Sequence, residues 1–237
     1  MYHFRLGEGI LSFTKARSAL RHNSVVLCCF VVCAVLFSLL PALDVRTTAL
    51  FYHTEEGFFW QSQPIAVLIY NLVPLAAAGL AIGLIAALLL ALFARFSYLQ
   101  AHRREVVYLL LVLLLGPGLV VNLVFKDHWG RARPNQVQQF GGSQQFTPAL
   151  LPTQQCGHNC SFVSGHASLG FYLLAMGFVK KQHRRHWMAV GLMTGATIGL
   201  VRIVQGGHFL SDVVFAFFAV YAVAWLLHFW LLREEGL

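Results

Sequence analysis

Long apolar runs separated by short polar segments dominate this chain from residue 25 to residue 232. Runs of about 20 apolar residues are long enough to cross the hydrocarbon core of a bilayer as helices. Helix is the only practical conformation for them, because lipid cannot satisfy exposed backbone groups and no run alternates like a barrel strand. The pattern predicts six transmembrane helices at about 25–43, 64–94, 106–125, 164–179, 187–203 and 213–232, of which 164–179 is the shortest.

The composition favours a membrane protein and excludes soluble, disordered and fibrous classes. Of the 237 residues, 58% are hydrophobic and 11% are charged, whereas soluble domains carry about 25% charged residues. The mean hydropathy is +0.67, and a soluble globule of this size has too little interior to hide so much hydrocarbon surface. We therefore expect one all-α polytopic membrane domain over residues 25–232, preceded by a cytoplasmic or interfacial segment over residues 1–24.

The positive charges predict which side of the membrane each loop faces. Of the 17 Lys and Arg residues, twelve lie on one side of the predicted helices: Arg5, Lys15, Arg17, Arg21, Arg95, Arg103, Arg104, Lys180, Lys181, Arg184, Arg185 and Arg233. The other five are Arg46, Lys126, Arg131, Arg133 and Arg202. Because basic residues concentrate in cytoplasmic loops, both termini are predicted to be cytoplasmic and the loop 126–163 periplasmic. The net charge of +8 is thus mainly an orientation signal, and we expect no nucleic-acid partner.

Two interpretations of the N-terminal segment stay open. Residues 1–24 lack an apolar core of the length that a cleaved signal peptide needs, so the first predicted helix is expected to act as an uncleaved anchor. An amphipathic helix in the headgroup plane fits the pattern of Phe4, Leu6, Ile10, Leu11 and Phe13. A disordered tail fits the segment as well.

Small residues predict where helices pack closely or bend. Glycines four residues apart, at Gly79 and Gly83 and again at Gly191, Gly195 and Gly199, are typical of tight helix contacts. The run 116–118 combines Gly, Pro and Gly, and proline removes a backbone donor inside a helix. We therefore expect a kink in the third predicted helix.

Three polar clusters lie at helix ends on the predicted outer side. They are the segment Lys126–Pro134, the tripeptide Ser164-Gly165-His166, and Arg202 with His208 and Asp212. Ionisable groups at the edge of a span are expensive, so they usually mark a site or are paired. The simpler alternative is that each cation reaches out to phospholipid headgroups. Arg46 shares its loop with Asp44, Glu55 and Glu56, which favours a solvated surface role.

The residue types in these clusters suit phosphoryl chemistry. Lys126, Arg133 and Arg202 can surround a phosphoryl group, because arginine offers a bidentate fork and lysine a compact charge. His208 and Asp212 are four residues apart at the start of the last helix, so the carboxylate can orient a nucleophilic imidazole. His166 stands at a predicted helix N-terminus that favours anions and can act as a general acid. Two histidines with separate roles fit a two-step transfer through phosphohistidine.

The order and spacing of these residues resemble a known signature. Lys126-x6-Arg133-Pro134, then Ser164-Gly165-His166, then Arg202-x5-His208-x3-Asp212 is similar to the three-part motif of the type 2 phosphatidic acid phosphatase superfamily. Val163 stands where that family usually has proline, and Val201 where it usually has serine, which removes one phosphate donor.

The resemblance implies roles for these residues. His208 is the implied nucleophile, Asp212 orients it and His166 is the general acid. Phosphate binding falls to Lys126, Arg133, Arg202, Ser164 and Gly165. No metal or other cofactor is implied, because the fixed cations supply the charge stabilisation.

Other site chemistries remain as alternatives. A catalytic metal could draw on His128, His158, His166, His208 and Asp212, but their spacing fits no dense ligand motif. We interpret Asp127, His128 and Arg131 as lining the loop, with a contact to the substrate headgroup as a secondary role. A lipid phosphotransferase is a further alternative, as is a transporter or scramblase that reuses the scaffold. Transporters usually place polar groups near the midplane of repeated halves, and no repeat is visible here.

The five cysteines fall into two groups. Cys28, Cys29 and Cys33 lie within the first predicted helix and are interpreted as small apolar packing residues. Cys156 and Cys160 lie in the predicted outer loop, where an oxidising compartment favours a disulfide that pins the segment leading to Ser164. Free thiols are the alternative, because the compartment is itself inferred.

Together these patterns predict a metal-independent lipid phosphatase, multi-pass in a bacterial inner membrane, with its active site facing the periplasm. The expected substrate is a phosphomonoester or diphosphate lipid: lipid A phosphate, undecaprenyl diphosphate, phosphatidylglycerol phosphate or phosphatidic acid. The stretches 146–149 and 160–168 resemble the lipid A phosphatase-like bacterial branch of the superfamily.

Overall fold

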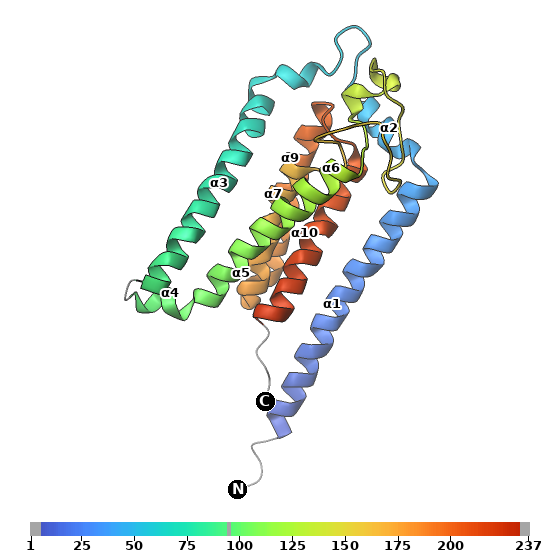
Figure 1. Cartoon of the computed structure of the whole chain (residues 1–237). Helices are drawn as coiled ribbons and strands as arrows, with labels where there is room; N and C mark the ends of the chain where they lie inside the picture. The colour runs from blue at the N-terminus through green and yellow to red at the C-terminus, as the bar shows by residue number, and fades with distance from the viewer. Residues whose placement is uncertain (1–5, 94–95, 233–237) are drawn as a thin grey trace.

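The protein is a bundle of helices with one polar end (Figure 1). The computed structural model describes residues 6–93 and 96–232, with side chains described from residue 23 onward. Within these ranges no β-strand occurs, and two isolated bridges pair His53 with Gly57 and Val137 with Gln144. The prediction of an all-α fold is confirmed.

The chain forms long helices joined by short helical turns. The long ones are α1 (Leu6–Leu39), α3 (Pro64–Phe93), α5 (Arg103–Leu113) running on through the π-helical η2 (Leu114–Phe125) into α6 (Lys126–His128), α9 (Arg184–Val204) and α10 (Leu210–Leu231). A shorter central stretch consists of α7 (Gly165–Phe171), η5 (Tyr172–Ala175) and α8 (Met176–Val179). The remaining elements are α2 (Ala42–Ala49), η1 (Phe59–Ser62), α4 (Ser97–Ala101), η3 (Pro134–Gln136), η4 (Gln138–Phe140) and η6 (Lys181–His183).

Four described helical stretches are long and apolar enough to cross a membrane, namely Pro64–Phe93, Arg103–His128, Lys181–Val204 and Leu210–Leu231. A fifth is counted if the bent pair Asn23–Leu39 and Ala42–Ala49 forms one span. The sixth predicted helix, Gly165–Val179, is apolar but shorter. Most of α7 is buried between neighbouring helices. A helix that is covered by protein need not match the thickness of the bilayer as closely as a helix that faces lipid.

The first predicted span, 25–43, ends earlier than its hydropathy suggests. α1 stops at Leu39, and α2 leaves it at an angle of 84°. Pro41 explains the break, because the residue before a proline is disfavoured in helical conformation. At its other end α1 begins at Leu6. Residues 1–5, and the side chains of residues 6–22 on which the amphipathic interpretation depends, lie outside the described part of the chain.

Glycines on α9 allow the closest helix packing in the bundle. A Cβ on Gly195 would lie 2.2 Å from the ring of Phe171, and one on Gly199 would lie 2.3 Å from Val213. The packing role predicted for the α9 glycines is confirmed. The same prediction is wrong for Gly79 and Gly83, because a Cβ there meets no described atom within 4 Å.

The Gly-Pro-Gly run, at which a kink was predicted, lies within a stretch of wider π-helix. Pro117 lies in η2, where the helix takes the wider π form from Leu114 to Phe125. The amide nitrogen Nδ2 of Asn122 donates a hydrogen bond to the carbonyl oxygen of Pro117, at 2.8 Å. Inserted side-chain bonds and missing proline donors are common causes of such irregular turns.

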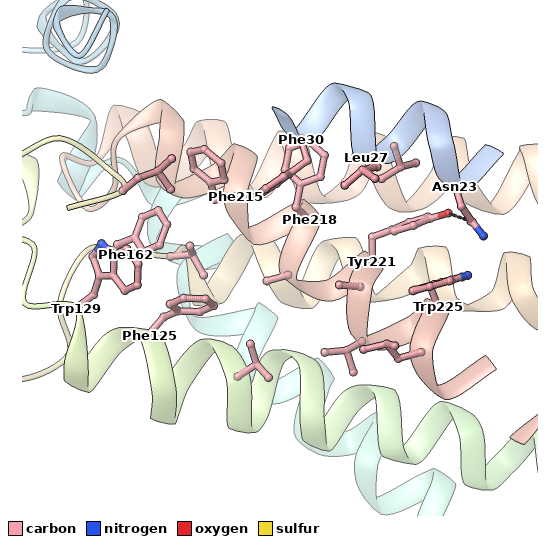
Figure 2. A pocket seen from close by; sticks show the side chains of 18 of the residues that line it. Asn23, Leu27, Phe30, Phe125, Trp129, Phe162, Phe215, Phe218, Tyr221 and Trp225 are labelled. Carbon is pink, nitrogen blue, oxygen red and sulfur yellow. Dashed lines mark hydrogen bonds between the residues drawn. The ribbon is translucent and has the colours of Figure 1, made fainter. Parts of the chain in front are cut away.

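An apolar cavity of about 710 Å³ lies between α1, η2 and α10 (Figure 2). Aromatic side chains dominate its walls, including Phe30, Trp129 and Trp225. At one end the Tyr221 hydroxyl donates to Asn23 Oδ1 at 2.9 Å. None of the predicted catalytic or phosphate-binding residues lines this cavity.

Candidate active site at the polar end of the bundle

The three polar clusters come together at the end of the bundle that carries α2 and α6 (Figure 1). Backbone hydrogen bonds tie the segments to one another. The Cys160 amide donates to the Lys126 carbonyl oxygen at 3.0 Å, and the Ser164 amide donates to the Asp212 carbonyl oxygen at 3.0 Å. The start of α5, which carries Arg103 and Arg104, lies at the opposite end of the bundle.

His208 is held in one orientation by the loop that precedes α7. Its Nδ1 donates a hydrogen bond to the Ser161 carbonyl oxygen at 2.7 Å. Asp212 Oδ2 lies 3.7 Å from the same nitrogen. The i, i+4 spacing thus places the carboxylate beside the imidazole, but the direct hydrogen bond goes to Ser161. A proton fixed on Nδ1 leaves the lone pair on Nε2, the form that a nucleophile requires.

Burial keeps the His208 imidazole neutral. The side chain is 1% exposed, and this burial lowers the pKa of His208 to about 3, against the opposing effect of Asp212. At neutral pH the ring therefore carries no proton on Nε2.

The pH dependence of stability is expected to report this buried neutral histidine. Between pH 6.5 and the folded pKa of about 3, the unfolded chain binds a proton at His208 that the folded protein does not. Stability contributed by His208 is therefore present above pH 6.5 and falls on acidification, by up to about 1.4 kcal/mol per pH unit. Melting temperatures in detergent between pH 7 and pH 5 measure this slope. His208→Gln should show a shallower slope than the wild type, and equal slopes would contradict the assignment.

Asp212 is completely buried and accepts hydrogen bonds on both oxygens. Oδ2 accepts from the Ser161 hydroxyl at 2.5 Å and from the Phe209 amide at 2.8 Å. Oδ1 accepts from Arg131 Nη1 at 2.5 Å. A buried carboxylate is stable as an anion only when it is paired in this way.

Arg131 is the main correction to the sequence-based interpretation of the site. It does not line a solvated loop, because its side chain is 0% exposed. Its guanidinium lies between two buried carboxylates, donating to Asp212 and, at 2.8 Å, to Asp44 Oδ2. It also donates to the Thr147 carbonyl oxygen at 2.9 Å and lies over the ring of Phe209.

Asp44, which the sequence places in the same loop as Arg46, is buried. The bend after α1 turns α2 inward, so that Asp44 is 1% exposed. It accepts hydrogen bonds from the amide and the hydroxyl of Ser211, at 2.8 and 2.5 Å. Asp44 therefore caps the first turn of α10 and shares Arg131 with Asp212. Arg46, in contrast, is exposed, as predicted.

Two of the predicted phosphate-binding cations converge on one asparagine. Lys126 Nζ donates to Asn159 Oδ1 at 3.1 Å. The Arg133 Nη2 atom donates to the backbone and side-chain oxygens of Asn159, at 2.7 and 2.8 Å. Burial lowers the pKa of Arg133. Asn159 Oδ1 thus bridges the two cations, which is the contact that a phosphate oxygen makes with such a clamp.

The loop that supplies Asn159 is closed by a disulfide between Cys156 and Cys160, whose Cα atoms lie 5.7 Å apart. Asn159 itself has a positive φ of 49°. The three other cysteines lie on α1, where Cys28 and Cys29 are exposed and Cys33 is partly buried. The packing interpretation is therefore wrong for Cys28 and Cys29.

Arg202 approaches the site from the end of α9. The guanidinium lies 4.6 Å from the centre of the Tyr70 ring and also bonds the side chain of Gln205. Its Nε atom is buried without a hydrogen-bond partner among the described residues. A Cβ on Gly207 would lie 2.2 Å from Arg202 Nη2, so a larger residue at this position would have to displace the guanidinium.

His166 and its neighbours complete the polar end. The Ser164 hydroxyl caps α7 by accepting from the Ala167 amide at 3.4 Å. A Cβ on Gly165 would lie 3.1 Å from Lys126 Nζ, so the glycine lets the ammonium approach α7. The His166 ring stacks on Tyr70 of α3, with ring centres 4.7 Å apart. Tyr70 was missed at the sequence level, because it lies outside all three motifs.

The residues considered for a metal site do not gather into a ligand group. Among the side chains of residues 23–93 and 96–232, no set of three or more from His, Cys, Asp or Glu is placed to hold a metal ion. His158 is 91% exposed and lies 3.6 Å from Asp127. His128 Nδ1 instead faces carbonyl oxygens of its own helix.

Fold and site together define a multi-pass helical membrane protein with a cationic clamp and two histidines at one end of its bundle. Residues 105–235 match the model of the PAP2 superfamily. Since the match covers more than half of the chain, the protein belongs to this superfamily.

The chain is also similar to individual curated proteins. A protein of Francisella tularensis subsp. novicida named lipid A 4'-phosphatase is 43% identical over 136 residues, which cover 56% of this chain and 61% of the relative. A lipid A 4'-phosphatase of Rhizobium leguminosarum is 44% identical over 107 residues, covering 43% of this chain and 44% of the relative. The matched segments thus span less than two thirds of these relatives. No solved structure matches the chain.

Proposed function

We propose that this protein is an integral membrane lipid phosphatase that acts through a phosphohistidine intermediate on His208. The observation that carries the proposal is that a candidate nucleophile and a phosphate clamp occur in one site. The buried imidazole of His208 is neutral, and its Nδ1 is bonded to Ser161. The clamp of Lys126 and Arg133 already holds two oxygens of Asn159.

In the proposed first step, the phosphate oxygens replace those of Asn159 on the clamp. Lys126, Arg133 and Arg202 neutralise the charge on the phosphoryl oxygens, with Ser164 and Gly165 at the start of α7 as further contacts. Nε2 of His208 attacks phosphorus, and the bond to the leaving oxygen breaks. His166, which enters this step as the imidazolium, donates a proton to that oxygen. Asp212, held by Arg131, stabilises the positive charge that forms on the His208 ring.

In the second step, water attacks the phosphorus of phosphohistidine. His166, now neutral, takes a proton from this water, and the bond between His208 Nε2 and phosphorus breaks. Inorganic phosphate leaves, and both histidines return to their starting forms. The charge stabilisation in both steps is assigned to fixed protein cations, so the proposed reaction needs no metal.

The proposed substrate is a lipid phosphate, with the phosphate groups of lipid A as the first candidates. The support is the similarity to the Francisella and Rhizobium relatives, which are named lipid A 4'-phosphatase. Undecaprenyl diphosphate, phosphatidylglycerol phosphate and phosphatidic acid carry the same phosphoryl group on a lipid and are the other candidates. A phosphotransferase would differ only in the acceptor that attacks the intermediate.

The proposed setting is the bacterial inner membrane, crossed six times, with both termini in the cytoplasm and the site facing the periplasm. The support is twofold. The start of α5, which carries Arg103 and Arg104, lies at the opposite end from the site, as the positive-inside rule requires. The Cys156–Cys160 disulfide lies on the site side, and disulfides persist in oxidising compartments such as the periplasm.

Phosphate release from a panel of lipid phosphates tests the proposed function. The detergent-purified protein is incubated in excess EDTA with lipid A, undecaprenyl diphosphate, phosphatidylglycerol phosphate, phosphatidic acid and a short-chain analogue. We expect metal-independent release, fastest from one lipid class. Release that requires an added metal would overturn the proposed chemistry, and no release from any lipid would favour a transporter or scramblase.

A further inference from the structure

His166 is held by a helix other than its own. Its Nε2 lies 3.1 Å from the backbone carbonyl oxygen of Tyr70 in α3. The two rings also stack, with an angle of 15° between their planes. A carbonyl oxygen can only accept, so Nε2 carries the proton in this contact. Helix α3 therefore fixes both the orientation of the imidazole and the nitrogen that bears its hydrogen.

A carbonyl oxygen inside an α-helix is normally unavailable for such a contact. It accepts a hydrogen bond from the backbone N–H four residues later. For Tyr70 the partner position is 74, which is proline inside α3. Proline has no N–H, and its ring clashes with the carbonyl of the fourth residue before it. Pro74 therefore frees the Tyr70 carbonyl oxygen and displaces it from the helix axis.

The same tyrosine also contacts the phosphate clamp. Its ring lies under the Arg202 guanidinium, at 4.6 Å from ring centre to Cζ. Helix α3 is otherwise lightly packed, with Ala66 and Ala91 as its buried residues. Tyr70 is thus a point at which this peripheral helix meets both a histidine and an arginine of the site.

We propose that Pro74 and Tyr70 of α3 are positioning residues for His166. This inference rests on the proposed function of His166 as the general acid. With the proton on Nε2 committed to the Tyr70 carbonyl, Nδ1 is the nitrogen that exchanges protons with the substrate. In the first step His166 starts as the imidazolium, with both ring nitrogens protonated. Its Nδ1 proton passes to the leaving alkoxide as the phosphorus–oxygen bond breaks, and the neutral ring keeps its proton on Nε2. In the second step Nδ1 takes the proton from the attacking water.

Pro74→Ala is the direct test, because alanine restores the N–H that pairs with the Tyr70 carbonyl within the helix. His166 then loses its acceptor, while every side chain of the site is kept. We expect the single-turnover rate with the best lipid phosphate of the panel to fall about 10- to 100-fold, as general acids contribute about 10²–10⁴. Single-turnover release of nitrophenolate from p-nitrophenyl phosphate should change less than about threefold, because this leaving group needs little protonation.

The matched control is Pro64→Ala. Pro64 is the first residue of α3, where no N–H of the helix is missing, so both rates should equal those of the wild type. Equal losses of Pro74→Ala with both substrates would show a structural role and overturn the proposal. Unchanged rates with both would also overturn it. Failure of the proposed function itself is distinguishable, since the wild type would then release no phosphate from any lipid.

Discussion

Replacing His208 with Ala is expected to reduce phosphate release by at least about a thousandfold with every substrate. The change removes the atom that attacks phosphorus, so neither a better leaving group nor a different lipid restores the reaction. The measurement is phosphate release by the purified variant from the best lipid phosphate and from p-nitrophenyl phosphate. More than a few per cent of wild-type activity with either substrate would contradict the assignment of the nucleophile.

His166→Ala provides the matched comparison for that prediction. Loss of a general acid should slow the lipid reaction by about 10²–10⁴. Nitrophenolate release in the first turnover should survive, since nitrophenolate departs without a proton. We expect His208→Ala to lose activity with both substrates and His166→Ala to lose activity only with the lipid. This difference distinguishes a nucleophile from a general acid. Equal behaviour of the two variants would mean that the roles are assigned wrongly.

Replacing Arg131 with Met is expected to cause the largest loss of stability. The change leaves two carboxylates, Asp44 and Asp212, buried without their shared cation. Removing one partner of a buried ion pair costs about 3–5 kcal/mol. The melting temperature in detergent measures the loss. Arg46→Met is the control, because Arg46 lies on α2 close to Asp44 but is exposed, and it should change stability by less than about 0.5 kcal/mol.

A second variant keeps this prediction testable if Arg131→Met does not fold. Adding Asp44→Asn removes one of the two stranded charges, and asparagine can still accept from Ser211. The double variant should therefore be more stable than Arg131→Met alone, which is the non-additivity expected of contacting residues. Additive losses, or an Arg131→Met protein as stable as Arg46→Met, would show that the buried ion pairs contribute little.

The helices and the motif residues could be predicted because their signals are local. Hydropathy alone gives the limits of α3, predicted at 64–94 and observed at Pro64–Phe93. His208 and Asp212 lie side by side as their spacing predicts, although His208 precedes α10, whose first residue is Leu210. Pro41 was a sequence signal for the early end of α1, but the predicted bounds of this helix followed the hydropathy pattern instead.

The partners of the motif residues could not be predicted, because they depend on how distant segments pack. Asp44 and Ser211 are 167 residues apart, and nothing around Asp44 distinguishes it from a surface acid. Arg131 looks like a third loop cation beside Lys126 and Arg133, and only the inward turn of α2 explains its burial. Tyr70 contacts His166 across 96 residues of sequence. The role of Pro74 in freeing the Tyr70 carbonyl oxygen can be recognised only once this contact is known.

The most direct test of a phosphohistidine on His208 is to trap it. His166→Ala protein is mixed with p-nitrophenyl phosphate that carries radioactive phosphorus in its phosphoryl group. The reaction is quenched in alkali, and the radioactivity bound to the protein is measured. Without His166 to activate water, the intermediate should accumulate to about one phosphate per chain, with the alkali stability and acid lability of a phosphorus–nitrogen bond. The His208→Ala/His166→Ala double variant should carry none. Label that persists in the double variant, or that withstands acid, would contradict the central claim.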